Sequence, residues 1–291
     1  MRIIVIGATG MLGHKMLQVL SSDFENSVYG TIRKNKNEIL KFDFIPNYNY
    51  IENVDIENIE NILSTLDRIR PQVIINCTGV TLRKTDNSSL EKNYSVNAYF
   101  PKILSLWCEN NRSKLIHFST DCVFDGSKGN YTESDYPTAN DIYGRSKFLG
   151  EISHPNVLTL RLSIIGREIF NQSELLEWFL SQKNKKISGY SDVFYTGVTT
   201  NFLATEVVRI IKKFPELYGL YHLGSEKISK FELLQMANKI FDNQTLIFED
   251  KSKKSDKSLC CDKYIKKTNF IKPNWVSMLQ DLKNDTTSYM S

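Results

Sequence analysis

Along the first half of the chain, short aliphatic runs alternate with longer stretches in which apolar residues recur every three or four positions. Residues 3–6 are all aliphatic, as expected of a β-strand that is covered on both faces. Residues 11–20 follow with the period of a helix. Because this unit repeats, the pattern predicts an α/β fold with a doubly wound parallel sheet and right-handed crossovers. We expect strands at residues 3–6, 27–32, 73–77, 114–119 and 157–161, and helices at residues 11–20, 56–70, 95–110 and 143–153.

The pattern changes after about residue 166, and no internal repeat or linker is visible. We expect residues 1–165 to form the domain that carries the sheet, with part of residues 200–225 returning to it. Residues 166–291 should form mainly a smaller lobe that binds the substrate. Its expected elements are helices at residues 174–182, 202–214 and 231–241, and a short strand at residues 221–224.

Composition and charge exclude several classes of protein. The 291 residues are 41% hydrophobic and 24% charged, and the net charge of +4 is too small to imply a nucleic-acid partner. No apolar run approaches the ~20 residues that would cross a bilayer, and the N-terminus lacks a signal-peptide layout. We therefore expect a cytoplasmic protein without a membrane partner. The five cysteines show no metal-ligand spacing, so we expect reduced thiols and no metal site.

A glycine-rich turn connects the first strand to the first helix. Gly7 permits a tight turn, Gly10 lets the backbone approach a pyrophosphate, and Gly13 lets the helix pack closely on the strand. The first helical residues, Met11 and Leu12, stand where free N–H groups and the positive end of the helix dipole bind phosphates. A strand, three glycines and a helix in this order favour a Rossmann-type, dinucleotide-binding domain over a turn without a ligand.

The end of the second predicted strand bears on the choice of dinucleotide. A carboxylate about 20 residues after the turn would hold the ribose hydroxyls of NAD. This chain instead has two cations there, Arg33 and Lys34. Since an arginine suits a 2′-phosphate, we expect NADPH, with NADH as the alternative. An exposed loop without a role in binding is the other interpretation of these two side chains.

Tyr143 and Lys147 lie four residues apart in a predicted helix and therefore share one face of it. A lysine ammonium beside a phenol favours the phenolate and lowers the tyrosine pKa from its usual ~10. Such a phenol can exchange a proton with a carbonyl/alcohol couple. Because both residue types are common on helix surfaces, this interpretation depends on the glycine turn and on the hydroxyls of Ser119 and Thr120.

Five motifs in order make the chain similar to the extended short-chain dehydrogenases/reductases, and most similar to their dTDP-4-dehydrorhamnose reductase branch. The motifs are Gly-Ala-Thr-Gly-Met-Leu-Gly at 7–13, Asn-Cys-Thr-Gly at 76–79, Val-Asn-Ala at 96–98, Ser-Thr-Asp-Cys-Val-Phe-Asp-Gly at 119–126 and Tyr-Gly-Arg-Ser-Lys at 143–147. The resemblance covers nearly the whole chain. It implies NADPH-dependent reduction of a nucleotide-diphosphate 4-keto-6-deoxysugar in surface polysaccharide or deoxysugar biosynthesis.

The resemblance also implies catalytic roles. Tyr143 would donate a proton to the substrate carbonyl oxygen, and Lys147 would lower its pKa and hydrogen-bond the nicotinamide ribose. Thr120 would position the same oxygen, a role for which its neighbour Ser119 is less suited. At the substrate end, Arg167 is the expected contact to the diphosphate.

Further cofactor contacts follow from the same resemblance. Asp43 and Phe44 match the family's adenine-contacting pair after the third strand, and Asn97 matches an asparagine with a supporting role. The segment that runs beside the cofactor after the fourth strand corresponds to Cys77, Thr78 and Gly79.

Departures from the branch leave the sugar open. Cys122 stands where tyrosine is common, Cys77 stands where alanine is usual, and residues 272–279 differ from the usual Arg-Pro pattern before Ser-x-Leu. An epimerase or epimerase-reductase of the same superfamily is one alternative, for which Cys122 is a candidate acid or base. A non-catalytic, nucleotide-binding regulatory subunit is another. The resemblance also implies a homodimer through the helices that carry Asn97 and Tyr143.

Overall fold

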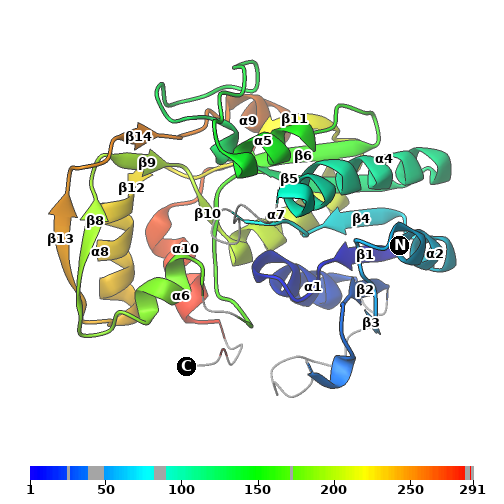
Figure 1. Cartoon of the computed structure of the whole chain (residues 1–291), viewed down its shortest axis with the longest axis horizontal. Coiled ribbons are helices and arrows are strands. Elements are labelled where there is room, and N and C mark those ends of the chain that lie inside the picture. The colour runs from blue at the N-terminus through cyan, green and yellow to red at the C-terminus, as the bar shows by residue number, and fades with distance from the viewer. Residues whose placement is uncertain (25–26, 39–48, 82–89, 171–172, 286–288, 290–291) are drawn as a thin grey trace.

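A parallel sheet forms the centre of the computed structural model, which describes residues 1–24, 27–38, 49–81, 90–170, 173–285 and 289 (Figure 1). Within these residues the sheet has seven strands in the order β11-β6-β5-β4-β1-β2-β3, and every neighbouring pair is parallel. The doubly wound α/β fold predicted from the sequence is confirmed. The strands are β1 (Ile3–Ile6), β2 (Val28–Thr31), β3 (Asn49–Ile51), β4 (Val73–Asn76), β5 (Lys114–Thr120), β6 (Val157–Leu162) and β11 (Gly219–His222).

The direction in which strands are added reverses between β1 and β4. The chain places β2 and β3 on one side of β1 and then returns to place β4 on its other side. In doubly wound sheets, ligands bind at this reversal, outside the carboxyl ends of the strands. The glycine turn after β1 and the segment after β4 meet there, since Cys77 N donates to the carbonyl oxygen of Ile6 at 3.0 Å.

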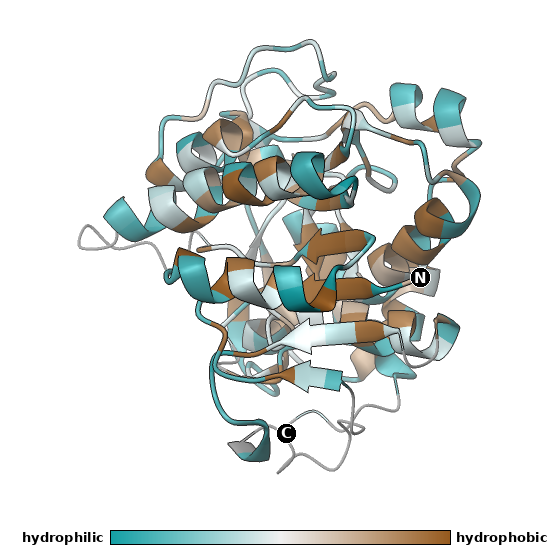
Figure 2. Cartoon of the chain, turned by 90° about the vertical axis from the view of Figure 1, so that its right-hand side faces the viewer, coloured by the Kyte–Doolittle hydropathy of each residue, from teal (hydrophilic) through white to brown (hydrophobic). Residues whose placement is uncertain are grey.

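Helices cover both faces of the sheet. α1 (Met11–Asp23) and α7 (Thr200–Lys213) pack on one face, and α2 (Ile59–Ile69) and α4 (Phe100–Asn111) pack on the other. In β1 the odd-numbered residues belong to the first core and the even-numbered residues to the second, as the alternation of side chains in a strand requires. Figure 2 shows hydrophobic residues on the central strands and a mixture of hydrophobic and hydrophilic residues on the helices.

A second group of elements lies beside the sheet, on the left in Figure 1. Its helices are α6 (Leu175–Leu180), α8 (Lys230–Phe241) and α10 (Trp275–Lys283), whereas α9 (Asp262–Thr268) packs against β11. We propose that this group, mainly within residues 166–291, is the substrate-binding lobe. Its short strands are β7 (Ile164–Ile165), β8 (Lys186–Tyr190), β9 (Val193–Tyr195), β10 (Val198–Thr199), β12 (Ile228–Ser229), β13 (Leu246–Asp250) and β14 (Ser255–Asp256).

Several predicted helix boundaries need correction. The helix predicted over residues 143–153 is α5 (Ile142–Leu149), which ends at Gly150, where the chain packs against the residues before α4. The single helix predicted over residues 95–110 is instead a π-helical turn, η4 (Ser95–Tyr99), followed by α4. The remaining short elements are α3 (Leu90–Tyr94) and the 3₁₀ turns η1 (Lys36–Glu38) and η5 (Asp121–Val123).

Candidate active site

The glycine turn brings β1 and α1 into direct contact. Gly7 has a φ of +82°, a conformation that residues with a Cβ rarely adopt. A Cβ at Gly13 would lie 2.0 Å from the carbonyl oxygen of Gly7, so only glycine fits there. At Gly10, which caps α1, a Cβ would meet nothing closer than 3.5 Å. The packing of the protein therefore does not explain the glycine at position 10, and its approach to a pyrophosphate stays a prediction.

The first turn of α1 is suited to an anion. No side chain caps the helix at Gly10, and the turn contains no acidic residue. The N–H groups of Met11 and Leu12 belong to the set that a helix leaves without intrahelical partners. Together with the positive end of the helix dipole, they can bind a pyrophosphate.

Arg33 and Lys34 lie just beyond the end of β2, and both side chains are exposed. They are thus at the carboxyl edge of the sheet, two strands away from β4. This is the edge at which a dinucleotide's adenosine half lies in doubly wound folds. Contact of Arg33 with a 2′-phosphate stays a prediction.

The expected adenine contacts need a correction. Asp43 and Phe44 lie outside the described residues. The third strand, β3, spans Asn49–Ile51, so it follows this pair in the chain instead of preceding it. After β3, an acidic residue is first followed directly by an apolar one at Asp55 and Ile56. Reasoning from the sequence missed them because three residues of strand give almost no periodic signal.

Residues 77–79 leave β4 in a fixed turn. Thr78 donates to Oδ1 of Asn76 from its backbone N–H at 3.1 Å and from its hydroxyl at 2.6 Å. Burial raises the pKa of the Cys77 thiol, so this side chain is uncharged. A Cβ at Gly79 would lie 3.9 Å from Nζ of Lys147. The segment after β4 therefore runs beside the predicted catalytic lysine.

α5 is held by its cap and by two close backbone contacts. The side chain of Asp141 accepts a hydrogen bond from the N–H of Gly144 at 2.8 Å, which starts the helix. A Cβ at Gly144 would lie 2.2 Å from the carbonyl oxygen of Cys122, and one at Gly150 would lie 1.9 Å from that of Asn97. The two glycines let the helix that carries the tyrosine–lysine pair approach both neighbours closely.

Asn97 ties α5 to the segment after β4. Its side chain accepts from the N–H of Val80 and donates to the carbonyl oxygen of Val80, both at 3.0 Å. It also donates to the Ser146 hydroxyl at 3.1 Å, and Ser146 donates to the carbonyl oxygen of Tyr143 at 3.0 Å. Asn97 lies in the π-helical turn η4, and such turns are frequent at functional sites. Its contacts are those of a supporting residue.

Lys147 is buried, and its ammonium group donates to the carbonyl oxygen of Phe118 at 2.6 Å. Burial lowers its pKa to about 8, and the charge of Glu151 acts in the opposite direction. At neutral pH the ammonium form is therefore favoured by a small margin.

Tyr143 is a weaker acid in the structure than the sequence suggested. Burial raises the pKa of its phenol above the usual 10, the negative form of the Cys122 thiol would raise it further, and a hydrogen bond with Thr120 lowers it. The ammonium group of Lys147 donates to the backbone carbonyl of Phe118 instead of bonding to the phenol. Tyr143 is thus a protonated phenol at neutral pH, which is the form that a proton donor requires.

Thr120 ends β5 beside this phenol. Its hydroxyl accepts from the N–H of Cys122 at 3.1 Å, donates to Asp121 at 3.2 Å and is within hydrogen-bonding reach of Tyr143. The structure therefore brings together the two hydroxyls that the sequence proposed for catalysis. The hydroxyl of Ser119 donates to a different group, the carboxylate of Glu151, at 2.6 Å.

Two acidic residues lie near the tyrosine, and neither was predicted to belong to the site. Glu174, at the start of α6, is close enough to Tyr143 to raise its pKa. Asp121 is buried, which raises its pKa, while Lys257 and Lys230 act to lower it. Glu174 and both lysines come from the group of elements beside the sheet, so this group approaches the two hydroxyls that are predicted to be catalytic. No local pattern carries this signal, because the contacts join distant parts of the chain.

Arg167 is held in an ion pair. Its Nε donates to the carboxylate of Glu177 at 2.6 Å, and its guanidinium lies 4.5 Å from the ring centre of Tyr289. The hydroxyl of Tyr289 in turn lies 3.1 Å from Nε2 of His14 in α1. Arg167 is therefore near the first turns of α1, with its charge already shared with Glu177. Contact with a diphosphate stays a prediction.

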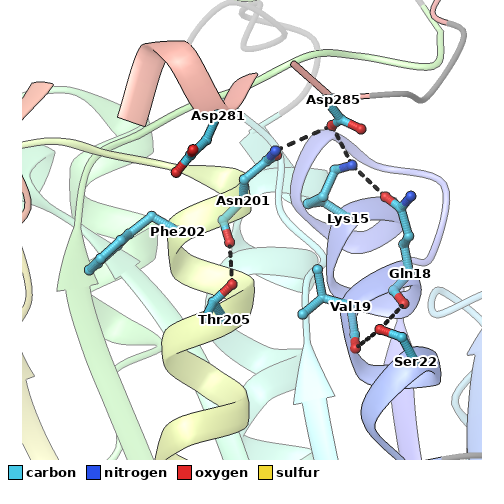
Figure 3. Close-up of a pocket in the computed structure, with 9 residues that line it drawn as sticks. All are labelled: Lys15, Gln18, Val19, Ser22, Asn201, Phe202, Thr205, Asp281 and Asp285. Atoms are coloured by element: carbon cyan, nitrogen blue, oxygen red, sulfur yellow. Dashed lines mark hydrogen bonds and ion pairs between the residues drawn. The ribbon is translucent and has the colours of Figure 1, made fainter. Parts of the chain in front are cut away.

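A groove of about 440 Å³ lies between α1 and α7 (Figure 3). Figure 3 shows Lys15 of α1 reaching Asp285, with which it forms a buried ion pair at 2.5 Å. Asn201 of α7 donates to the same carboxylate at 3.3 Å. These contacts join the segment after α10 to α1. Because none of the predicted catalytic residues lines this groove, it is not the candidate active site.

Neither a metal centre nor a membrane span is found within the described ranges. These ranges contain no group of three or more histidine, cysteine, aspartate or glutamate side chains that could hold a metal ion. None of their helices combines the length and the apolar character that a bilayer span needs.

Comparison with known proteins agrees with this geometry. The chain is 29% identical to the dTDP-4-dehydrorhamnose reductase of Aggregatibacter actinomycetemcomitans over 84% of its own length and 83% of that protein. It is 25% identical to methionine adenosyltransferase 2 subunit beta of Danio rerio over 80% and 71% of the two chains. Its fold is similar to that of dTDP-4-dehydrorhamnose reductase from Bacillus anthracis, solved in complex with NADP, with a TM-score of 0.79 at 22% identity over 98% and 99% of the two chains.

A family model extends over almost the whole chain. It matches residues 1–282 and is described as the RmlD substrate binding domain. The matched range includes the glycine turn, the tyrosine–lysine helix and the elements beside the sheet. The resemblance inferred from five short motifs is thereby confirmed, and the chain belongs to the RmlD substrate binding domain family.

Proposed function

We propose that the protein uses NADPH to reduce the keto group of a nucleotide-diphosphate 4-keto-6-deoxysugar, in the biosynthesis of deoxysugars for surface polysaccharides. At the coarser level, the family and the reductase among its relatives make the chain an NAD(P)-dependent oxidoreductase. The observation that carries the finer proposal is that the Tyr143 phenol and the Thr120 hydroxyl lie together, while Lys147 of the same helix lies beside the segment after β4.

The dinucleotide would lie across the reversal point of the sheet. The position of Gly10, where the protein itself leaves room for a side chain, fits the approach of a pyrophosphate. A fold neighbour solved with NADP supports NADPH as the cofactor. We propose Asp55 and Ile56 for the adenine contacts in place of Asp43 and Phe44. The other residues that would hold the cofactor are Gly7, Met11, Leu12, Gly13, Arg33, Cys77, Thr78, Gly79, Tyr143 and Lys147.

When bound, the nicotinamide supplies the hydride. As the carbonyl is reduced, negative charge develops on its oxygen, and Tyr143 donates its proton there. Thr120 offers a second hydrogen bond that is strongest when the oxygen is most negative, which stabilises the transition state. Lys147 would bind the cofactor ribose and keep a positive charge near the phenol. Arg167 is the proposed contact to the substrate diphosphate, in which case it would share its charge between the phosphates and Glu177.

Replacing Arg33 with alanine should weaken NADPH binding about tenfold and leave NADH binding nearly unchanged, because only NADPH carries the 2′-phosphate. The two dissociation constants can be measured by titrating the fluorescence of the reduced cofactors. Arg68→Ala, which removes an exposed arginine on α2, is the matched control. Equal affinities for both cofactors in the wild type and in Arg33→Ala would exclude this role.

The reductase proposal is tested by cofactor consumption with a panel of keto-sugar nucleotides. Oxidation of NADPH with a 4-keto-6-deoxysugar nucleotide is the expected result. Tight cofactor binding without consumption of any substrate would favour a regulatory subunit instead. The similarity to methionine adenosyltransferase 2 subunit beta is the observation behind that second candidate.

An epimerase would need an additional acid or base that acts on the sugar ring. Burial raises the pKa of the Cys122 thiol to about 12, and the neighbouring Asp121 carboxylate raises it too. The thiol therefore stays protonated at neutral pH and is a poor base, which favours reduction alone. Incorporation of deuterium from D₂O into ring positions other than the reduced carbon would demonstrate epimerisation.

A further inference from the structure

We propose that Glu151 is a positioning residue that fixes the end of α5 to the sheet and supplies the negative charge that keeps Lys147 an ammonium ion. This inference rests on the proposed function, in which Lys147 serves the tyrosine and the cofactor. Glu151 follows the helix cap Gly150, one turn of chain after Lys147. Its N–H donates to the carbonyl oxygen of Phe148 at 3.0 Å, so the helical turn continues up to it.

The carboxylate of Glu151 joins α5 to two strands. Nε and Nη2 of Arg161 on β6 each donate to one of its oxygens at 2.6 Å, and the hydroxyl of Ser119 on β5 donates at 2.6 Å. The side chains of Arg161 and Glu151 are 3% and 9% exposed. A bidentate pair of this kind is geometrically specific, and one that is buried is hardly screened by solvent.

A third strand holds Arg161 in turn. Its Nη1 lies 3.3 Å from Nε2 of His222 on β11, and its guanidinium lies 5.3 Å from the ring centre of Phe124. Burial and the charge of Arg161 lower the pKa of His222 to about 3, so the ring is neutral. Its Nδ1 lies 3.0 Å from the carbonyl oxygen of Tyr131, to which it donates, and Nε2 then accepts from Arg161. The carboxylate thus fixes α5 relative to β5, β6 and β11.

The groups around Lys147 show why one carboxylate matters. The ammonium bonds to the backbone at Phe118, and Asn97 of η4 and Gly79 after β4 are uncharged neighbours. His117 of β5 is neutral as well, because burial and the charge of Lys147 lower its pKa.

The charged groups near Lys147 are Asp121 of η5 and the pair formed by Glu151 and Arg161. On the side of η5, Asp121 is bonded to Thr120 and lies near the tyrosine. Glu151 is the acid that raises the pKa of Lys147, and Arg161 shares its carboxylate and so weakens this effect.

These contacts set the direction in which the pKa of Lys147 should change when Glu151 loses its charge. Lys147 has a pKa of about 8, because burial lowers it more than Glu151 raises it. Loss of the negative charge lets the pKa fall further, so a larger share of Lys147 is neutral at pH 8. The neutral amine lacks the positive charge that our mechanism requires, and activity should then be lost at lower pH than in the wild type.

Two substitutions separate charge from position. Glu151→Gln keeps the shape and removes the charge, so kcat/KM at pH 8.5 relative to pH 6.5 should fall about fivefold or more compared with the wild type. Glu151→Asp keeps the charge and shortens the reach to β6. Its pH profile should match that of the wild type, while kcat falls about tenfold or more at every pH. Glu109→Gln, which removes an exposed carboxylate on α4, is the matched control and should change neither quantity.

A direct measurement of the Lys147 pKa tests the role of the Glu151 charge independently of the proposed function. Lysine ¹³Cε shifts are followed against pH in selectively labelled protein, with the Lys147 signal assigned by its absence in Lys147→Arg. A lower midpoint in Glu151→Gln supports the inference even if no keto-sugar is reduced, in which case only the proposed function fails. An unchanged midpoint in Glu151→Gln, or wild-type kcat in Glu151→Asp, overturns it. The aspartate variant also decides the positional part if Glu151→Gln does not fold.

Discussion

Replacing Tyr143 with phenylalanine should lower kcat by about 10²–10⁴-fold, because the proton donor is lost while the ring is kept. Cofactor affinity should change little, since the glycine turn and the segment after β4 hold most of the dinucleotide in our proposal. Loss of kcat without loss of binding is the signature of an interaction made in the transition state. Steady-state kinetics and a fluorescence titration with NADPH measure the two quantities separately.

The chain offers a matched control for this substitution. Tyr136 precedes the same helix and is 79% exposed. Tyr136→Phe therefore removes a phenol hydroxyl that is close to Tyr143 in the chain but lies outside the proposed site. It should leave both kcat and NADPH affinity unchanged. A Tyr143→Phe enzyme that retains most of its activity would exclude Tyr143 as the acid, and the mechanism would then need another proton donor.

The pKa values divide the pH dependence between two groups. Burial raises the pKa of Tyr143 above 10, so its proton is available throughout the neutral and mildly alkaline range. Lys147 has a pKa of about 8, so the loss of its charge comes first as the pH rises. The alkaline limb of the activity profile should therefore report the lysine and not the tyrosine. From the sequence, the tyrosine was expected to have the lowered pKa, because spacing alone cannot show that the Lys147 ammonium bonds to Phe118.

Features with a local cause were predictable from the sequence. Gly7 is required by its φ of +82° and Gly13 by a contact within the same strand–helix turn, and β1 has the bounds that its aliphatic run predicted. The start of α5 follows from the cap at Asp141, two residues before Tyr143. The parallel order of the sheet followed in turn from the repetition of strand and helix.

Features that depend on distant contacts were not predictable. β3 pairs with β2 over three residues, too few for a periodic signal, and the end of the third strand was consequently placed too early in the chain. Glu174 and Glu151 gave no signal at all. Glu174 lies near the tyrosine although it belongs to the elements beside the sheet, and Glu151 pairs with Arg161 of β6. Burial also reversed the expected direction of the Tyr143 pKa, since sequence spacing contains no measure of desolvation.

The second large effect concerns two glycines of the same turn, which should fail in different ways. In Gly13→Ala the new methyl group would lie 2.0 Å from the carbonyl oxygen of Gly7, so β1 and α1 must separate. We expect a loss of about 3 kcal/mol or more in the free energy of unfolding, or an insoluble protein. In Gly10→Ala the nearest atom is 3.5 Å away and the φ of −73° suits alanine, so stability should change by about 1 kcal/mol or less.

The contrast between these variants tests whether the turn serves a cofactor. Gly10→Ala should fold like the wild type and yet bind NADPH about tenfold or more weakly, because its methyl group stands where the pyrophosphate must approach the backbone. Urea denaturation measures the stability of both variants, and fluorescence titration measures cofactor binding by the folded one. If Gly10→Ala bound NADPH as tightly as the wild type, the glycine would have neither a packing reason nor a ligand reason. The phosphate site would then have to lie elsewhere along the carboxyl edge of the sheet.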